Sequence, residues 1–296
     1  KHILGLEELP TIPLVLARIL DEIESPRSSA RSIGQAISYD QSITAKVLKV
    51  ANSAYYSLSR RVDSLSVGIT FLGLREIKTL VMSAGLFDIF FQRDSEAVFN
   101  REQLWLHSIG TATAAKMVAR HIGYSNIEGA FLAGLIHDIG KVVLDNYLKE
   151  DYKKVIVASS SQDETFYQLE CRILETHHAE VGGWLIDRWN FPPSLVDSVS
   201  YHHEIHHPQN VHKELTAIAH LSDIVCQMEG IGFSGNFCLP TVDDYVWKAI
   251  NLSPQDLELI AGAPALRRRY LDIANCQVDA RYCRVLQQYN RVLLQR

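Results

Sequence analysis

Histidine is the residue type in this chain that most clearly suggests chemistry. Twelve histidines occur in 296 residues, and eight of them fall between His177 and His220. Histidine is the commonest metal ligand in proteins, and helices can present several ligands to one point. A surface position is the simpler interpretation for any one of these histidines alone. Their clustering therefore favours a metal site without establishing one.

A second pattern is the sequence GLIHDIGK at residues 134–141, which places His137 beside Asp138 at the end of an apolar helix. Neighbouring helical residues diverge by about 100°, so both side chains can face one metal only where the helix ends. Gly140 permits such a bend. An aspartate can also bridge two cations about 3.5–4 Å apart. Lys141 then places a cation beside the site, where it could contact a phosphate oxygen.

The elements that must position these residues are predicted to be helices throughout. Apolar residues recur at helical spacing, and the period-two alternation of strands is nearly absent. Short helices are expected after Ser28 or Ser29 and after Asp40, because these side chains are suited to N-caps. Gly230–Pro240 is expected to be a loop. Further helices are predicted at 10–25, 64–72, 75–91, 102–122, 127–137, 163–175, 179–189, 194–203, 215–229 and, in a last helical section, 242–296.

Composition narrows the classes of protein to which the chain could belong. Its length suits one large domain or two modest ones, and 47% hydrophobic and 21% charged residues are typical of a soluble globular protein. A net charge of −5 gives no overall attraction to nucleic acid or to anionic lipid, so neither is an expected partner. Five scattered cysteines without a CxxC pair suggest reduced thiols and a cytoplasmic location. We find no signal peptide and no apolar run long enough to span a membrane.

The motif at 137–141 resembles the defining motif of HD-superfamily phosphohydrolases. The N-terminal part is similar to the opening of HDOD domains, which are bacterial signalling modules, and the likeness extends over about residues 6–226. The segments that carry it are LPTIP at 9–13, IGQAISYDQSITAKVL at 33–48, ANSAYY at 51–56 and SLSVGITFLGL at 64–74. The resemblance implies an all-α fold with an HD-superfamily helical core. The expected parts are an N-terminal helical subdomain at 1–95, an HD-like metal-binding subdomain at 96–230 and a C-terminal helical extension at 231–296.

Related HD-GYP phosphodiesterases suggest which residues would be the metal ligands. The positions that match are His107, His137, Asp138, His178, His202, His203 and Asp223. One division assigns a first metal to His107, His137, Asp138 and Asp223, and a second to His178, His202, His203 and the bridging Asp138. Five imidazoles and two carboxylates suit one or two ions of iron or manganese, with zinc or nickel possible, better than magnesium or calcium. The alternative is a hydrogen-bonded polar cluster in a helical groove.

Two functions remain open from the sequence. The stretch after Glu204, IHHPQN at 205–210, lacks the Gly-Tyr-Pro signature of HD-GYP enzymes, which argues against hydrolysis of cyclic di-GMP. We expect a bacterial signal-transduction regulatory domain of HDOD type that retains an HD-type mono- or dinuclear metal site. Its partner would be a signalling protein or a small phosphorylated ligand. The alternative is an active metal-dependent phosphohydrolase, in which Asp138 and Lys141 would be the catalytic residues.

Overall fold

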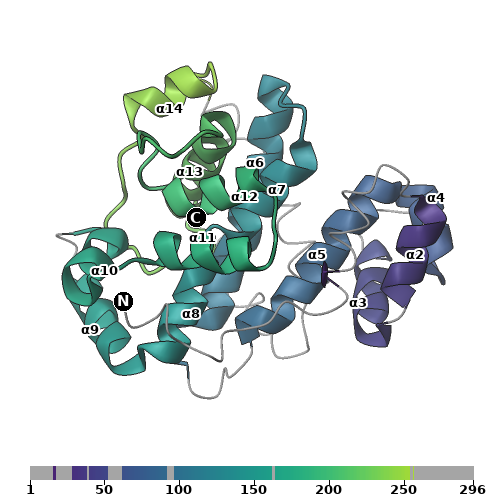
Figure 1. Ribbon diagram of the computed structural model, residues 1–296, viewed down its shortest axis with the longest axis horizontal. Helices are drawn as coiled ribbons and strands as arrows, with labels where there is room; N and C mark the ends of the chain where they lie inside the picture. The colour runs from purple at the N-terminus through teal and green to yellow at the C-terminus, as the bar shows by residue number, and fades with distance from the viewer. Residues whose placement is uncertain are drawn as a thin grey trace, which may run out of the picture. The chain divides into compact units, whose positions relative to one another are not determined.

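The structure is a computed structural model that describes residues 16–17, 29–38, 40–52, 62–91, 97–161, 164–253 and 256. Every regular element among these residues is a helix, so the fold is all-α as predicted (Figure 1). The described residues divide into two compact units, one ending at Leu86 and the other beginning at Phe87. This division lies inside a helix. The predicted border at 95/96 follows a polar stretch, 92–96, that lies outside the described residues.

The described part of the first unit contains residues 16–17, three short helices and the beginning of a longer one. Ser64 caps α4 by accepting a hydrogen bond from the backbone N–H of Val67, and Gly73 ends that helix at φ 80°. Of the helix expected at 10–25, only residues 16 and 17 are described, and both are helical. The helices are α2 (Ala30–Ser38), α3 (Gln41–Ala51), α4 (Leu65–Leu72) and α5 (Leu74–Phe91), whose last residues belong to the second unit.

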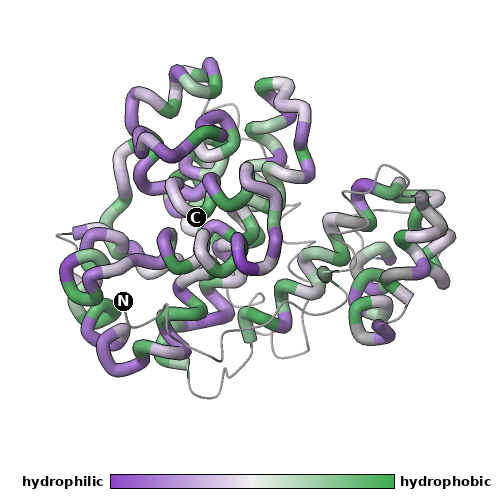
Figure 2. The backbone as a smooth tube through the Cα atoms, viewed as in Figure 1, coloured by the Kyte–Doolittle hydropathy of each residue, from purple (hydrophilic) through white to green (hydrophobic). Residues whose placement is uncertain are grey.

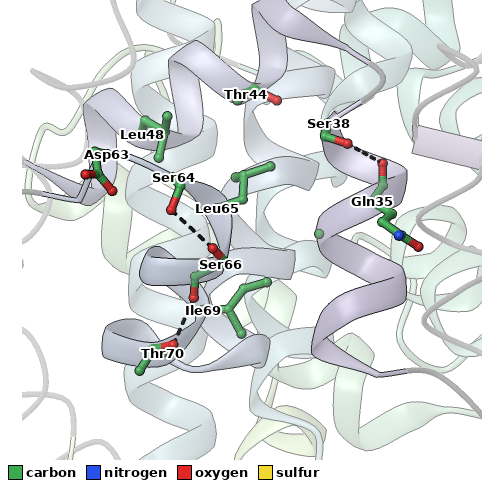
Figure 3. A pocket seen from close by; sticks show the side chains of 11 residues that line it. Gln35, Ser38, Thr44, Leu48, Asp63, Ser64, Leu65, Ser66, Ile69 and Thr70 are labelled. Carbon is green, nitrogen blue, oxygen red and sulfur yellow. Dashed lines mark hydrogen bonds between the residues drawn. The ribbon is translucent and has the colours of Figure 1, made fainter.

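A pocket of about 740 Å³ lies among α2, α3 and α4 in the first unit (Figure 3). Its wall combines the apolar side chains of Leu65 and Ile69 with several hydroxyl groups. The hydroxyl of Ser38 donates to the carbonyl oxygen of Gln35 at 2.8 Å. That of Thr70 donates to the carbonyl of Ser66 at 2.9 Å. These hydroxyls are therefore already bonded within their own helices.

The second unit is built around α6, the 22-residue helix Arg101–Ile122. Asn100 caps its first turn, and Gly123 ends it in the left-handed region at φ 71°. The helix is buried along most of its length and packs against α7 and α13. The other helices of the unit are α7 (Ile127–Ile136), α8 (Ile139–Tyr147), α9 (Lys149–Ser159), α10 (Phe166–Leu174), α11 (His178–Arg188), α12 (Pro193–Tyr201), α13 (Lys213–Met228) and α14 (Asp244–Ala249).

The helices of the second unit agree with the predicted ranges to within a few residues, with two exceptions. Helices α8 and α9 were not predicted. Asp138 is at the N-cap position of α8, although its side chain makes no capping hydrogen bond; the sequence analysis placed it only at the end of the preceding helix. Of the last helical section expected from 242, the described part contains α14, which ends at Ala249, followed by the non-helical residues 250–253.

Segment Gly230–Pro240 is a loop, as predicted, and residues 231–237 pack on the helices of the second unit. The backbone N–H of Phe233 donates to the carbonyl oxygen of Gln103 at 3.0 Å. The side-chain oxygen of Asn236 accepts from the N–H of Phe166 at 2.6 Å. Gly232 lies so close to α6 that an added Cβ would meet the backbone nitrogen of His107 at 2.2 Å. The start of the expected C-terminal extension thus belongs to the second unit.

Hydrophobic and hydrophilic residues are interspersed along the helices of both units (Figure 2). Among the described residues, no helix combines the length and the apolar character needed to cross a membrane. The apolar side chains instead form the cores of the two units, with residues such as Ile33 and Val47 in the first and Trp105 and Leu144 in the second fully buried.

Candidate metal centre

The predicted ligands lie together inside the second unit, at positions where its helices begin, end or cross. His107 is in the middle of α6, and Asp223 is in α13. His137 and Asp138 form the junction between α7 and α8. His178 begins α11, while the two remaining histidines follow α12. All are buried except His203, which is half-buried.

The ligand atoms form a first group, His107, His137 and Asp223, and a second group, His178, His202 and His203, each with three atoms within 4.8 Å of one another. A third set, His137, Asp138 and His202, meets the same criterion and links the two groups. In the first group, Nε2 of His107 lies 2.9 Å from Oδ1 of Asp223. In the second, Nε2 of His178 lies 2.9 Å from Nε2 of His203 and 3.4 Å from Nε2 of His202. Several imidazole nitrogens therefore face a common point, as they do around a shared ion.

Asp138 lies between the two groups and turns one carboxylate oxygen toward each. Its Oδ1 is 3.1 Å from Nε2 of His178, in the second group. Its Oδ2 is 3.3 Å from Nε2 of His137 and 3.9 Å from Nε2 of His107, in the first group. This is the arrangement that a carboxylate bridging two cations requires. The division of the ligands over two metals stays a prediction.

Acceptors outside the cluster set the orientation of three imidazoles. Nδ1 of His137 donates to the carbonyl oxygen of Gly134 at 2.8 Å, and Nδ1 of His202 donates to that of Val199 at 2.8 Å. A carbonyl oxygen only accepts, so the proton must be on Nδ1 in both rings. Nδ1 of His178 is paired in the same way with the carboxylate of Glu170. In each ring Nε2 is therefore the nitrogen that faces the cluster, which is a common arrangement in metal-binding histidines.

The charges of the cluster strongly affect its pKa values. Burial lowers the pKa of His137, but the negative charges of Asp138 and Asp223 outweigh burial and raise that pKa to about 10. Burial acts to raise the pKa of Asp138, yet His137 and Lys141 hold it well below its ordinary value. Burial and the neighbouring histidines lower the pKa of His202 and keep the ring neutral. The cluster thus contains two ionised carboxylates, the neutral imidazole of His202, and a protonated His137 that must lose a proton before it can bind metal through Nε2.

The donor set fits a divalent transition metal. Nε2 of His137 is buried and has no hydrogen-bond partner among the described residues, although it faces two carboxylates. Imidazole combined with carboxylate suits iron, manganese, nickel and zinc. Each group supplies three ligands, and Asp138 can serve as a further ligand to both.

Lys141 lies beside the cluster, but its charge is already paired. Its Nζ donates to Oδ2 of Asp138 at 2.7 Å and to the carbonyl oxygen of Ser234 at 2.8 Å. Only 2% of the residue is exposed. The two bonds use two of the three N–H donors of this buried ammonium. The expected phosphate contact therefore stays a prediction.

Gly140 has a different role from the one expected. It is the second residue of α8 and does not bend the chain there. A Cβ at this position would meet the carbonyl oxygen of His178 at 1.9 Å and the backbone nitrogen of Gly182 at 2.8 Å. The missing side chain allows α8 to approach the first turn of α11, and this approach brings Asp138 close to His178.

The neighbouring histidines make contacts elsewhere. His177 caps α11 by accepting a hydrogen bond from the N–H of Glu180, so it is His178, and not His177, that faces the cluster. His206 pairs with Asp243 at 3.1 Å on the surface. These contacts show why histidine content alone does not identify the ligands.

Two side chains that the sequence analysis did not single out contact the cluster directly. Glu170 pairs with His178, and the side-chain amide of Gln227 donates to Oδ1 of Asp223 at 2.7 Å. Glu170 lies on the buried side of α10 with Phe166 and Leu169. A charged residue at an apolar position of a helical pattern was a signal that could have identified it. Gln227 follows Asp223 by four residues, the spacing of neighbours on one helix face.

A family model matches most of the chain. The family model of the HDOD domain matches residues 9–205. The chain belongs to the HDOD family. An HDOD domain protein of unknown function from Geobacter sulfurreducens has a similar structure, with a TM-score of 0.81 and 27% identity, over 93% of this chain and 95% of that one.

Two further proteins are similar to this HDOD chain. A candidate signal transduction protein from Marinobacter aquaeolei VT8 shares the fold at 19% identity, with a TM-score of 0.76, over 91% of this chain and 59% of that one. An uncharacterized protein of Treponema pallidum (strain Nichols) is 28% identical over 211 residues, which are 71% of this chain and 40% of the relative. The chain thus spans less than half the length of that relative.

Proposed function

We propose that this chain is a regulatory HDOD domain of bacterial signal transduction whose second unit holds an HD-type centre for two divalent metal ions. The observation that carries the proposal is Asp138, whose two oxygens face two separate groups of histidines at 3.1 and 3.3 Å. Iron or manganese is the expected metal. Such ions would stabilise the fold, because metal binding to the folded form alone adds directly to its stability.

Two observations favour regulation over turnover. Nearly all the proposed ligands are buried, with only His203 half-buried. The ammonium of Lys141, the cation nearest to the bridging carboxylate, is bound to Asp138 and Ser234. The expected partner is a signalling protein or a small phosphorylated ligand in the cytoplasm, and nucleic acid is not expected.

The second candidate is a metal-dependent phosphohydrolase, and the complete donor set beside Lys141 favours it. Bound ions would activate water and neutralise charge on a phosphoester. Asp138 would orient the ions, and Lys141 would stabilise negative charge on the phosphoryl oxygens once its bond to Ser234 had opened.

The deciding experiment is elemental analysis of protein purified without chelator or metal-affinity columns. About two metal atoms per chain are expected, and no metal even after anaerobic reconstitution would overturn the metal centre. A screen of phosphomonoesters and phosphodiesters with the loaded protein then separates the two functions. Turnover that Asp138→Ala abolishes would support the hydrolase, whereas metal without turnover supports the regulatory domain.

A further inference from the structure

Glu170 is a fully buried carboxylate in α10, on the side of the helix that also buries Phe166 and Leu169. Placing an ionised carboxylate in a protein interior is costly unless hydrogen bonds replace the water that it loses. The partners of Glu170 therefore indicate what this position requires.

Both carboxylate oxygens of Glu170 have partners. Oε1 accepts a hydrogen bond from the hydroxyl of Tyr152, in α9, at 3.1 Å. Oε2 accepts from the backbone N–H of His178 at 2.9 Å and also from Nδ1 of the same residue. Two of the three bonds thus go to one histidine, through its main chain and its ring.

These two bonds leave little freedom to the ring of His178. The main-chain bond fixes the first residue of α11, where a negative charge also interacts favourably with the helix dipole. The ring bond requires the proton on Nδ1, so the neutral ring that binds a metal has its lone pair on Nε2. Nε2 of His178 lies 3.1 Å from Oδ1 of Asp138 and 2.9 Å from Nε2 of His203. It therefore faces the other members of the second ligand group.

We propose that Glu170 is the positioning residue of the second metal ion: it holds His178 in the tautomer and orientation that present Nε2 to that ion. The inference rests on the proposed metal-binding function and deepens it. Partners of this kind typically change metal affinity by about 10–100-fold when they are removed.

A purely structural role would give a different result, and Tyr152 provides the matched control. Tyr152→Phe removes the bond to Oε1 and leaves both bonds to His178 in place. It should lower the thermal midpoint of the metal-free protein and leave metal affinity within about twofold of wild type. Glu170→Ala should lower the affinity for one of the two ions by roughly 10–100-fold. Glu170→Gln, which retains one acceptor oxygen for Nδ1, should recover part of that loss.

The test uses the whole chain and Co²⁺ as the probe, with affinities from chelator competition and the visible absorption of bound Co²⁺ as a spectroscopic readout. In a His178→Ala background, Glu170→Ala should have no further effect on affinity, because it acts through that ring.

Equal Co²⁺ affinity in wild type and both Glu170 variants would overturn the positioning role and leave the metal centre standing. If Glu170→Ala fails to fold, the Co²⁺ affinity of Glu170→Gln is compared with that of Tyr152→Phe instead. A wild-type chain that binds no Co²⁺ would overturn the metal centre and this inference with it.

Discussion

The ammonium of Lys141 donates a 2.7 Å hydrogen bond to Oδ2 of Asp138, one helical turn earlier, with both side chains only 2% exposed. Removing one partner of a buried ion pair leaves the other charge uncompensated, which typically costs about 3–5 kcal/mol. The pair is therefore important for the stability of the fold as well as for any chemistry at Asp138.

Lys141→Ala should lower the free energy of unfolding of the metal-free protein by about 3–5 kcal/mol and should leave metal stoichiometry unchanged. The measurement is urea denaturation in the presence of a chelator. Lys153→Ala is the matched control, because Lys153 makes a bond of similar length, 2.8 Å, to Glu150 with the same spacing, but those side chains are 47% and 79% exposed. The control should change stability by less than about 1 kcal/mol. Similar changes in the free energy of unfolding in both variants would contradict the stabilising role of the buried pair of Lys141 and Asp138.

Asp138→Ala should remove both metal ions, because each of its oxygens faces one ligand group. Asp223→Ala should remove mainly one ion, since Asp223 contacts only His107 and His137 of the proposed ligands. Metal atoms per chain, measured after equal dialysis, distinguish the two variants. An Asp138→Ala protein with the full wild-type metal content would exclude the bridging assignment.

Metal binding should release a proton from His137 at pH 7.5. Asp138 and Asp223 raise the pKa of this imidazole to about 10 against burial, so the ring carries a proton in the metal-free protein, and ligation through Nε2 must displace it. Apparent affinity should therefore rise with pH up to about 10. The stability of the metal-free fold should change with pH in the opposite direction. The stabilisation that follows from the raised pKa of His137 is complete below its pKa in the unfolded chain, about 6.5, and is lost as pH rises through its pKa in the folded chain, about 10.

The proton can be counted by titration calorimetry in two buffers with different ionisation enthalpies. A binding heat that is independent of the buffer at pH 7.5 would show that His137 is already neutral, and would remove the basis of the expected pH dependence.

Asp145→Ala should destabilise the second unit by about 3–5 kcal/mol. This carboxylate is buried and accepts from Nε of Arg101 at 2.7 Å and from the backbone N–H of Val98 at 3.0 Å. Its loss leaves a fully buried guanidinium without a counter-charge. Asp151→Ala, which breaks an exposed pair with Lys154, is the control for urea unfolding and should have an effect below about 1 kcal/mol. Equal midpoints for the two variants would contradict the prediction.

The helical class and the membership in the HDOD family could be predicted from the sequence, because apolar spacing and a run of motifs reflect local chemistry. The side chains predicted as ligands also lie together. Helix α8 was missed because only two residues, His137 and Asp138, separate it from α7. The division of the chain inside α5 was not predictable from composition, since no turn signal interrupts that helix.

The contacts that complete the site depend on the tertiary structure. The bond from Lys141 to the carbonyl of Ser234 joins residues 93 positions apart, and its acceptor is a backbone group that any residue type would provide. The pairing of Glu170 with His178 is visible only in the folded chain, where this side chain reaches the first residue of α11. Sequence patterns can identify candidate metal ligands but say little about the groups that orient them.

Helix α8 extends only from Ile139 to Tyr147, yet a functional group stands at each of its ends. Asp138 precedes its first turn, and Asp145 in its last turn binds the backbone where the chain passes from α5 into α6. A nine-residue helix is a rigid rod about 14 Å long. The proposed bridging carboxylate and the backbone of Val98 and Phe99, all in the second unit, are therefore held at opposite ends of one short helix.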